Sequence, residues 1–494
     1  MSERFVVSMM RLFLAALPTL CGLEIAEKPI IAAPAEKLAQ AAPRGKEASG
    51  AVVGRLSADA EPILTKLRPE FPNRTDDEIV QVLRNYANAD KSTSAQGLKW
   101  FTERLRKARE QSKVVAAMEG LNWAVGYDYE LDSSGNFISS PTPPATARLR
   151  ELLGKDFFAD VRLVYVMEKN PPGVHVFRVP FPPLKNMRDE EVQLIHRLPA
   201  IEILGFHDRI MTDKIMVCVS GLPRLSQLSL YHTDISRTGL ARIGKLAQLR
   251  ELSIHETKIA DAEMAHLNGL KRLRSLRLWY AEITDAGANH LEGLTQLEEL
   301  TIDHGGITDA GLKFLHGMHQ LRSLSIQSND ISDAGLEHLR GLGQLEDLNL
   351  WGLTITDSGV QHLQGLTLLR KLDLFGTRVT GAGLKNLRGM HHLQELDLME
   401  TQVGDVGLEN LKDLAQLRRL VLRETKVTDA GLHFLNGLTK LEHLNLMDTQ
   451  ITDAELVHLQ GLSKLRWLGI YYTKVTDAGA ERLRKALPEA FVYH

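Results

Sequence analysis

The stretch LRKLDLFGTRVTGAGLKNLRGMHH, residues 369–392, is followed at once by LQELDLMETQVGDVGLENLKDLAQ, residues 393–416. The leucines return at the same places, while most of the letters between them change. The same spacing continues in both directions, so that residues 177–488 form 312 residues, or 13 blocks of 24, without an insertion. The first of these blocks is a degraded copy. Self-similarity at one fixed period predicts a solenoid, in which each unit packs against copies of itself.

Each block contains one expected strand and one expected helix. Leu372 and Leu374 alternate with other residues, which is typical of a strand with one buried face. Leu384 and Leu387 are three residues apart, which is the spacing of a helical face. A Thr-Asp pair opens most helices and favours an N-cap with an acidic first turn, and a recurring glycine after the helix predicts a left-handed C-cap. Examples are Thr428-Asp429, Thr452-Asp453, Gly341, Gly365, Gly389, Gly437 and Gly461.

The unit LxxLxLxxTxITDAGLxxLxGLxx resembles the repeats of the leucine-rich repeat superfamily. It is similar to the cysteine-containing subclass that is common in F-box substrate receptors, and to the 24-residue repeats of many bacterial proteins. The resemblance implies an α/β solenoid of horseshoe shape, with one parallel strand and one helix per repeat. The Cys/Asn position of that subclass is mostly threonine here, and we expect its hydroxyl to bond neighbouring backbone. These residues are Thr233, Thr257, Thr377, Thr401, Thr425, Thr449 and Thr473, with Asn329 the only asparagine.

The chain before the repeats divides by composition. Residues 1–23 carry arginines ahead of a short apolar run, which predicts a signal peptide and export to the periplasm or cell surface. The alternative is a frayed amphipathic N-terminus on a cytoplasmic protein. Residues 24–56 are rich in Ala and Pro and indicate a linker. Residues 57–176 predict a mainly helical region that also holds a hairpin within 123–140 and a strand at 160–168, which would cap the open end of the solenoid.

The last residues predict a cap at the other end of the array. Pro488 stops the final helix, and residues 489–494 are expected to form a shortened strand. Counting by 24 places Val492 in the register of Leu468, so Val492 would cover the last core layer while Tyr493 joins the concave face.

Composition and motifs exclude several function classes. The formal net charge of −3 provides no basic field for nucleic acid, and the two cysteines permit no disulfide framework. No phosphate-binding loop, nucleophile elbow, zinc-protease or kinase signature occurs, so we expect no enzyme, no cofactor and no membrane span in the mature chain. His207, His232 and His255 fall in successive repeats, but His207 and His255 would lie roughly 10 Å apart, which does not favour a shared metal ion.

The residues that alternate with the core leucines are expected to line the concave face. Three of the five tryptophans of the chain fall there, and tryptophan, tyrosine and arginine are the usual anchors of binding surfaces. The alternative is that the rings stack across adjacent strands and only stabilise the array. The candidate partner-binding residues are Tyr231, Trp279, Tyr280, Trp351, Phe375, Arg423, Trp467, Tyr471 and Tyr472.

Acidic residues gather in the C-terminal half of the same face. They favour a partner with a basic patch, although a plain solvated surface is the alternative. We predict a non-enzymatic scaffold that binds a protein partner. The alternative function is recognition of a glycan such as a cell-envelope polysaccharide, because aromatic rings beside carboxylates also suit sugars. The acidic residues are Asp347, Asp373, Glu395, Asp397, Glu400, Glu424 and Asp448, and Lys371, Arg419 and Arg423 interrupt them.

Overall fold

The computed structural model divides into two compact units, Met1–Ile79 and Val80–His494, and every described residue belongs to the second. The predicted signal peptide and linker therefore lie outside the described residues. The described residues are 107–108, 110–118, 124–127, 161–166, 194–195, 197–207, 213–231, 233, 235–257 and 259–494.

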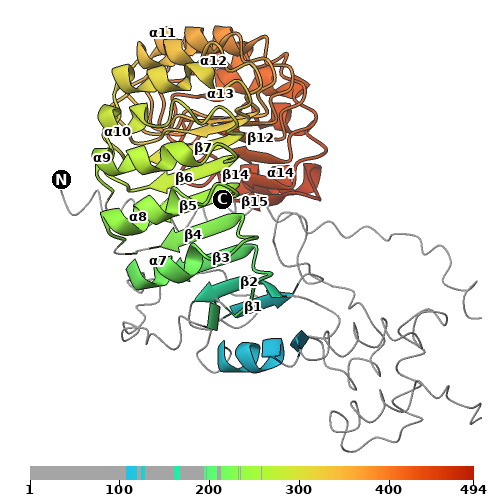
Figure 1. Ribbon diagram of the computed structural model, residues 1–494. Helices are drawn as coiled ribbons and strands as arrows, with labels where there is room; N and C mark the ends of the chain where they lie inside the picture. The colour runs from blue at the N-terminus through green and yellow to red at the C-terminus, as the bar shows by residue number, and fades with distance from the viewer. Residues whose placement is uncertain are drawn as a thin grey trace, which may run out of the picture. The chain divides into compact units, whose positions relative to one another are not determined.

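One sheet holds 15 strands in the order in which they occur in the chain. From β3 onward each strand pairs with the next in parallel at an offset of 24 residues, so the sheet confirms the predicted solenoid. Figure 1 shows the strands on the inner side of the repeats and the helices outside them. The strands are β1 (Ala124–Tyr127), β2 (Val161–Val166), β3 (Ile203–His207), β4 (Gln227–Tyr231), β5 (Glu251–His255), β6 (Ser275–Trp279), β7 (Glu299–Asp303), β8 (Ser323–Ser325), β9 (Asp347–Asn349), β10 (Lys371–Asp373), β11 (Glu395–Asp397), β12 (Arg419–Val421), β13 (His443–Asn445), β14 (Trp467–Gly469) and β15 (Phe491–Tyr493).

The start of the sheet differs from the repeat count. The first block predicts a strand beside β3, but β3 pairs in parallel with β2, which is the strand expected at 160–168. The first block contains the run VPFPP, residues 179–183, and proline cannot donate a hydrogen bond to a ladder. β2 also pairs with β1 in antiparallel fashion, while the second arm of the predicted hairpin lies outside the described residues.

The helical segments are short, and many are 3-10 rather than α, because only about half of each 24-residue unit remains after the strand and its turn. They are α7 (Asp213–Val219), α8 (Arg237–Ile243), α9 (Asp261–Met264), η5 (Ala265–Gly269), α10 (Asp285–Asn289), η6 (Asp309–Gly317), η7 (Gly335–Leu339), α11 (Asp357–Val360), η8 (Gln361–Leu363), η9 (Gly383–Leu387), α12 (Asp405–Glu409), α13 (Asp429–Leu432), η10 (His433–Gly437), η11 (Leu456–Leu459) and α14 (Asp477–Ala486).

The repeating leucines form one continuous core. Leu374, Leu384 and Leu387 have no exposed surface, and Leu372 keeps 2% of its surface exposed. The same core extends from Val114, before the repeats, to the C-terminal strand β15. Burial of each such side chain stabilises the fold by about 1.5–3 kcal/mol, so the array is held together chiefly by its leucines.

The TDAG letters of the repeat also connect neighbouring repeats. Asp357 accepts two hydrogen bonds from the next repeat, from the backbone N–H of Thr380 at 2.8 Å and from its hydroxyl at 2.6 Å. The Thr380 hydroxyl in turn accepts from the N–H of Ala382, which confirms the predicted capping role of threonine at this position. A Cβ atom at Gly383 would collide with Oδ1 of Asp357, so glycine is required there. We call this contact the Asp–Thr bridge, and it joins Asp261–Thr284, Asp285–Thr308, Asp309–Ser332, Asp333–Thr356, Asp357–Thr380, Asp405–Thr428, Asp429–Thr452 and Asp453–Thr476.

The left-handed backbone does not lie where the sequence predicts it. Among the described glycines only Gly352 and Gly376 have a positive φ, so the predicted left-handed C-cap after each helix is wrong. The helices end instead at residues such as Leu438, with φ −85° and an N–H that donates to Leu435. The left-handed position is the eighth residue of the repeat, in the turn after the strand. It is held by Glu256, Tyr280, His304, Ser328, Gly352, Gly376, Glu400, Glu424, Asp448 and Tyr472.

Threonine at the ninth position bonds within its own turn. The Thr377 hydroxyl donates to the carbonyl oxygen of Leu374 at 2.7 Å, and Thr401 donates to Leu398 at 2.6 Å. Asn329 reaches further, because its amide donates to Ile302 of the preceding repeat at 2.7 Å. The threonines therefore close turns, whereas the single asparagine links two repeats.

Candidate binding surface on the concave face

The concave face presents the third, fifth and seventh residues of each repeat, since the fourth and sixth point into the core. None of the nine predicted residues on this face is fully buried. Tyr280 is 41% exposed and Tyr472 is 68% exposed, and the other seven are partly exposed. The structure gathers most of the rings into three groups.

The first group is a ladder of rings on neighbouring strands. Tyr231 and His255 stack with ring centroids 4.8 Å apart, and the His255 and Trp279 rings are 4.1 Å apart. The three residues are register partners on β4, β5 and β6. Burial also raises the pKa of the Tyr231 phenol. Cross-strand stacking, the alternative raised from the sequence, is therefore present here, and His255 serves as a ring in the ladder.

The second group lies in the middle of the array. The Trp351 and Phe375 rings stack at 5.3 Å, and His304 meets Trp351 edge-on at 6.3 Å. His304 also stacks on Tyr280 at 4.1 Å. Sequence reasoning missed His304, although counting 24 residues from Tyr280 leads to it.

The third group lies near the C-terminal end. His443 stacks on Trp467 at 4.2 Å, and Tyr471 contacts both Tyr472 at 4.1 Å and Tyr493 at 5.2 Å. Burial, aided by the charge of Arg419, lowers the pKa of His443 to about 3, so the ring is neutral at physiological pH. His443 was missed as well, and it stands 24 residues before Trp467.

Asp373 and Asp397 are register partners on β10 and β11. Each accepts a hydrogen bond from the N–H two residues later, Phe375 at 2.9 Å and Met399 at 3.0 Å. Burial raises the pKa of both carboxyls, and the neighbouring carboxylate raises that of Asp373 further. The face is therefore less negative near neutral pH than its sequence suggests.

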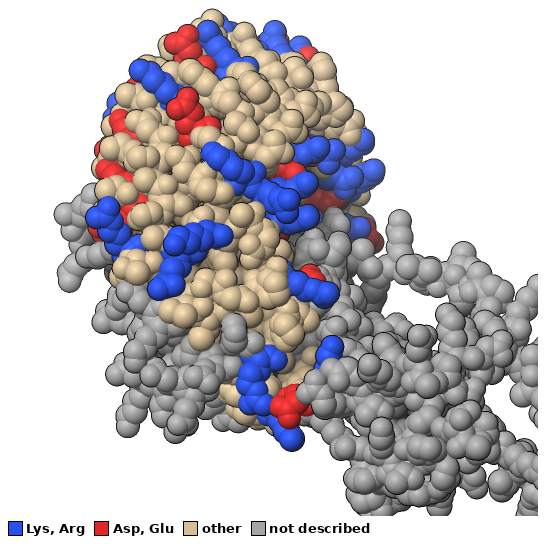
Figure 2. All heavy atoms as spheres, viewed as in Figure 1, with Lys and Arg blue, Asp and Glu red and all other residues tan. Residues whose placement is uncertain are grey.

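The remaining charges of the predicted acidic cluster are largely paired. Arg423 binds Asp448 at 2.9 Å and Glu424 at 3.0 Å, and Lys371 binds Glu395 at 3.0 Å. Figure 2 shows side chains of both signs interspersed on the visible face of the molecule. Arg423 is thus engaged within the protein, which leaves the aromatic rings as the more available part of the surface.

One further carboxyl lies in the centre of the face. Asp303 is 3% exposed and accepts hydrogen bonds from Ser325 at 2.7 Å and Gln327 at 3.1 Å. Burial raises its pKa to about 7. Among the described residues no three His, Cys, Asp or Glu side chains are grouped as metal ligands would be. No helix in the described part of the chain combines the length and apolar character that crossing a membrane requires.

Comparison with known proteins agrees with this architecture. Two family profiles described as leucine rich repeat match the chain, one at residues 415–475 and the other at 318–339 and 389–412. A search of the curated proteins gives no match.

Solved structures share the fold. An internalin of Listeria monocytogenes, inlF, has a TM-score of 0.50 and 23% identity over 62% of this chain and 88% of its own. A leucine-rich repeat protein of Leptospira interrogans has a TM-score of 0.38 and 18% identity over 63% and 93% of the two chains. The plant peptide hormone receptor RGFR1, solved in complex with RGF2, has a TM-score of 0.39 and 15% identity over 57% of each chain. With its unbroken 24-residue units and parallel sheet, the protein belongs to the leucine-rich repeat superfamily.

Proposed function

We propose that the protein is a non-enzymatic scaffold that binds a protein partner on its concave face. The observation that carries this proposal is the pair of stacked rings formed by Trp351 and Phe375, which stay partly exposed in the middle of the face. Large, rigid rings of this kind contribute much contact area at little cost in conformational entropy, which makes them frequent anchors of protein interfaces.

The nine candidate residues divide into two kinds of contact. The rings of Trp279, Trp351, Phe375 and Trp467 are the proposed anchors, and the exposed Tyr280 and Tyr472 extend the surface on either side. Arg423, held by two carboxylates, would orient rather than anchor a partner. No finding favours the glycan alternative, and we do not propose it.

Export of the protein is part of the same proposal. It rests on the short apolar run behind the arginines of residues 1–23. Sequencing the N-terminus of protein purified from its native source would test this. We expect a shortened chain outside the cytoplasm, and an intact Met1 in cytosolic material would contradict export.

The binding proposal is tested with a partner isolated by the wild-type protein and then purified. We expect Trp351→Ala combined with Phe375→Ala to weaken its binding by about tenfold or more, since truncation of a central aromatic anchor commonly costs over 1 kcal/mol. Isothermal titration calorimetry gives the affinity.

The matched control is Val457→Ala, which changes an exposed apolar residue, 58% exposed, on the helix side of the array. It should leave the affinity unchanged. Equal affinities for the wild type and the double variant, with both correctly folded, would place the binding surface elsewhere. Binding of the wild type to a glycan array but to no protein would favour the alternative function.

A further inference from the structure

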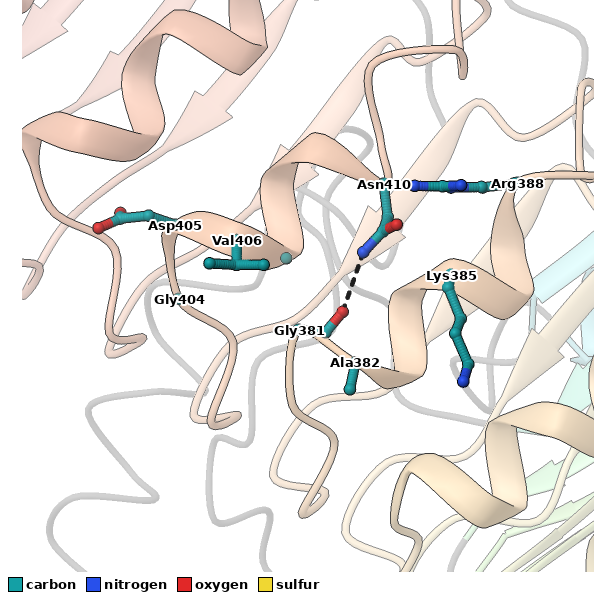
Figure 3. A pocket seen from close by; sticks show the side chains of 9 residues that line it. Gly381, Ala382, Lys385, Arg388, Gly404, Asp405, Val406 and Asn410 are labelled. Atoms are coloured by element: carbon teal, nitrogen blue, oxygen red, sulfur yellow. Dashed lines mark hydrogen bonds between the residues drawn. The ribbon is translucent and has the colours of Figure 1, made fainter.

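A pocket of about 480 Å³ lies on the helix side of the array, where η9 of one repeat meets α12 of the next. Figure 3 shows it from close by. This side of the molecule is separate from the concave face. Among the lining residues are Gly381, Lys385, Arg388, Gly404, Val406 and Asn410.

The pocket coincides with a missing Asp–Thr bridge. Gly381 stands where the other repeats have aspartate, and Gly404 stands where the next repeat would supply threonine. In the equivalent position of the preceding interface, the N–H of Thr380 donates to Asp357 at 2.8 Å. The N–H of Gly404 has no such acceptor, and it donates no hydrogen bond within the described structure. A backbone donor is therefore left without a protein partner at the wall of the pocket.

The same repeat also departs from its neighbours in charge. Arg340 and Lys412 occupy the position of Arg388 in other repeats, and each pairs at 3.5 Å with a glutamate three residues earlier. The residue three before Arg388 is Lys385. Neither Lys385 nor Arg388 forms an ion pair with any described acidic side chain. The pocket thus holds two cations where the corresponding sites hold one cation and one anion.

The one carboxylate among the lining residues does not neutralise them. Asp405 accepts hydrogen bonds from the N–H and the hydroxyl of Thr428, at 2.8 and 2.7 Å. In Figure 3 its side chain points away from Lys385 and Arg388. The amide of Asn410 is also engaged, because it donates to the carbonyl oxygen of Gly381 at 3.1 Å.

We propose that this pocket binds a carboxylate side chain from an acidic segment of a protein partner. The carboxylate would accept from the N–H of Gly404 and pair with Lys385 and Arg388, since charge-assisted hydrogen bonds of this kind are strong and directional. Val406 is 79% exposed beside the cations. A small free anion would leave that apolar surface uncovered, whereas a peptide that carries the carboxylate covers it, and this favours a protein segment as the occupant.

The test uses the full-length protein and a short fluorescein-labelled peptide of alternating glutamate and alanine. Fluorescence anisotropy should show binding that weakens as salt is added, and the glutamine counterpart of the peptide should bind about tenfold more weakly or worse. In protein labelled with isotopic nitrogen at glycine, the amide signal of Gly404 should shift on addition of the glutamate peptide. Equal binding of the two peptides would overturn the proposal.

Variants separate the pocket from general surface charge. Lys385→Gln combined with Arg388→Gln should weaken binding by about tenfold or more, whereas Lys412→Gln should not, because Lys412 already has Glu409 as its partner. Val406→Glu should weaken binding, and Val457→Glu, at a comparable exposed site elsewhere, should not. Similar losses in the test and control variants would overturn the site.

Two further measurements identify the occupant and keep this site distinct from the concave face. Free glutarate that binds as tightly as the peptide would overturn a protein segment as the occupant. Trp351→Ala should leave peptide binding unchanged, because the pocket lies on the helix side. A loss of peptide binding in that variant would overturn the assignment to the pocket.

Discussion

At the scale of single residues, the protein uses the same few side-chain contacts again and again. Asp357 illustrates this, because one carboxylate accepts both the backbone N–H and the hydroxyl of Thr380 in the next repeat. The contact joins two repeats and also fixes the threonine that caps the following helical segment. Its loss therefore affects an interface rather than one side chain.

Asp357→Ala should lower the free energy of unfolding by about 1–3 kcal/mol, because two donors lose their acceptor. Urea denaturation followed by circular dichroism measures the change. The matched control is Asp477→Ala, in the last repeat, where the side chain is fully exposed and no further repeat follows. It should cost less than about 1 kcal/mol, the usual value of a carboxylate in a first helical turn. Equal losses would show that the bridge to the next repeat contributes nothing.

Asp373→Asn should make stability less dependent on pH. Burial raises the pKa of Asp373, so the folded protein holds this proton to a higher pH than the unfolded chain does. Stability then falls as pH rises from about 4, the ordinary carboxyl value, through the raised value. Asparagine cannot ionise, and Asn349 makes the same hydrogen bond to the N–H of Trp351 in an earlier repeat.

The variant should consequently exceed the wild type in stability at pH 8 by on the order of 1 kcal/mol, and the two should converge near pH 4. Thermal unfolding across this pH range is the measurement. Parallel stability curves for the two proteins would contradict the raised pKa.

Periodicity reveals some of these residue contacts and hides others. The predicted aromatic residues lie on the concave face because a side chain at a given repeat position always faces the same way. The Asp–Thr bridge was not predicted, because its partners are 23 residues apart in sequence and the local pattern shows only a helix cap. The left-handed eighth position was also hidden, since Tyr280 or Glu424 carries no glycine-like signal there.

At the scale of elements, the two ends of the sheet explain how far the repeat count extends. Ile195 and Leu198 of the degraded first block are buried in the core, so its helical half keeps the register. Its strand half does not take the place beside β3, which β2 fills. Periodicity identified the block from its apolar spacing but could not reveal that a strand from outside the repeats would complete the sheet. At the other end β15 takes the register that counting by 24 predicts, with Val492 opposite Leu468.

Deletion of residues 488–494 should fray the last repeat. The deletion removes the hydrogen bond from the N–H of Ile470 to Tyr493 at 2.8 Å and exposes Leu468 and Ile470, which are now fully buried. We expect a lower melting temperature and faster hydrogen exchange in residues 465–487, with a local loss of a few kcal/mol, on the order of one or two buried apolar side chains.

Val492→Ala is the milder companion variant, and it should produce a smaller change of the same sign because it keeps the strand and removes only part of the buried side chain. Unchanged exchange protection in both variants would show that β15 does not cap the array.

At the scale of the whole molecule, stability is a sum over repeats and the interfaces between them. The interface between the repeats that start at 369 and 393 lacks the Asp–Thr bridge, since Gly381 and Gly404 replace both partners. Close backbone packing remains there, because a Cβ atom on Gly381 would lie 2.7 Å from Cα of Gly407. The core is continuous across this interface, but one stabilising contact is missing.

Hydrogen exchange in mild denaturant should therefore show a step in protection at this interface. Residues 393–487 should open together at a lower free energy than the repeats before them, because opening that starts at the C-terminal end pauses where bridged interfaces begin. Mass spectrometry of exchanged peptides gives the profile. In Asp357→Ala the step should move to the interface before residue 369, and a smooth decline of protection from the C-terminus in the wild type would contradict the prediction.

The constant offset of 24 residues between β3 and β15 turns the concave face into a ruler. Each repeat adds about 4.8 Å to its length, the spacing of neighbouring strands. Every cut made at the same position of two repeats joins matching backbone, so one whole unit can be removed or duplicated without changing the register of any other. The length of partner that the face can span is thus set by counting units, independently of which side chains each unit presents.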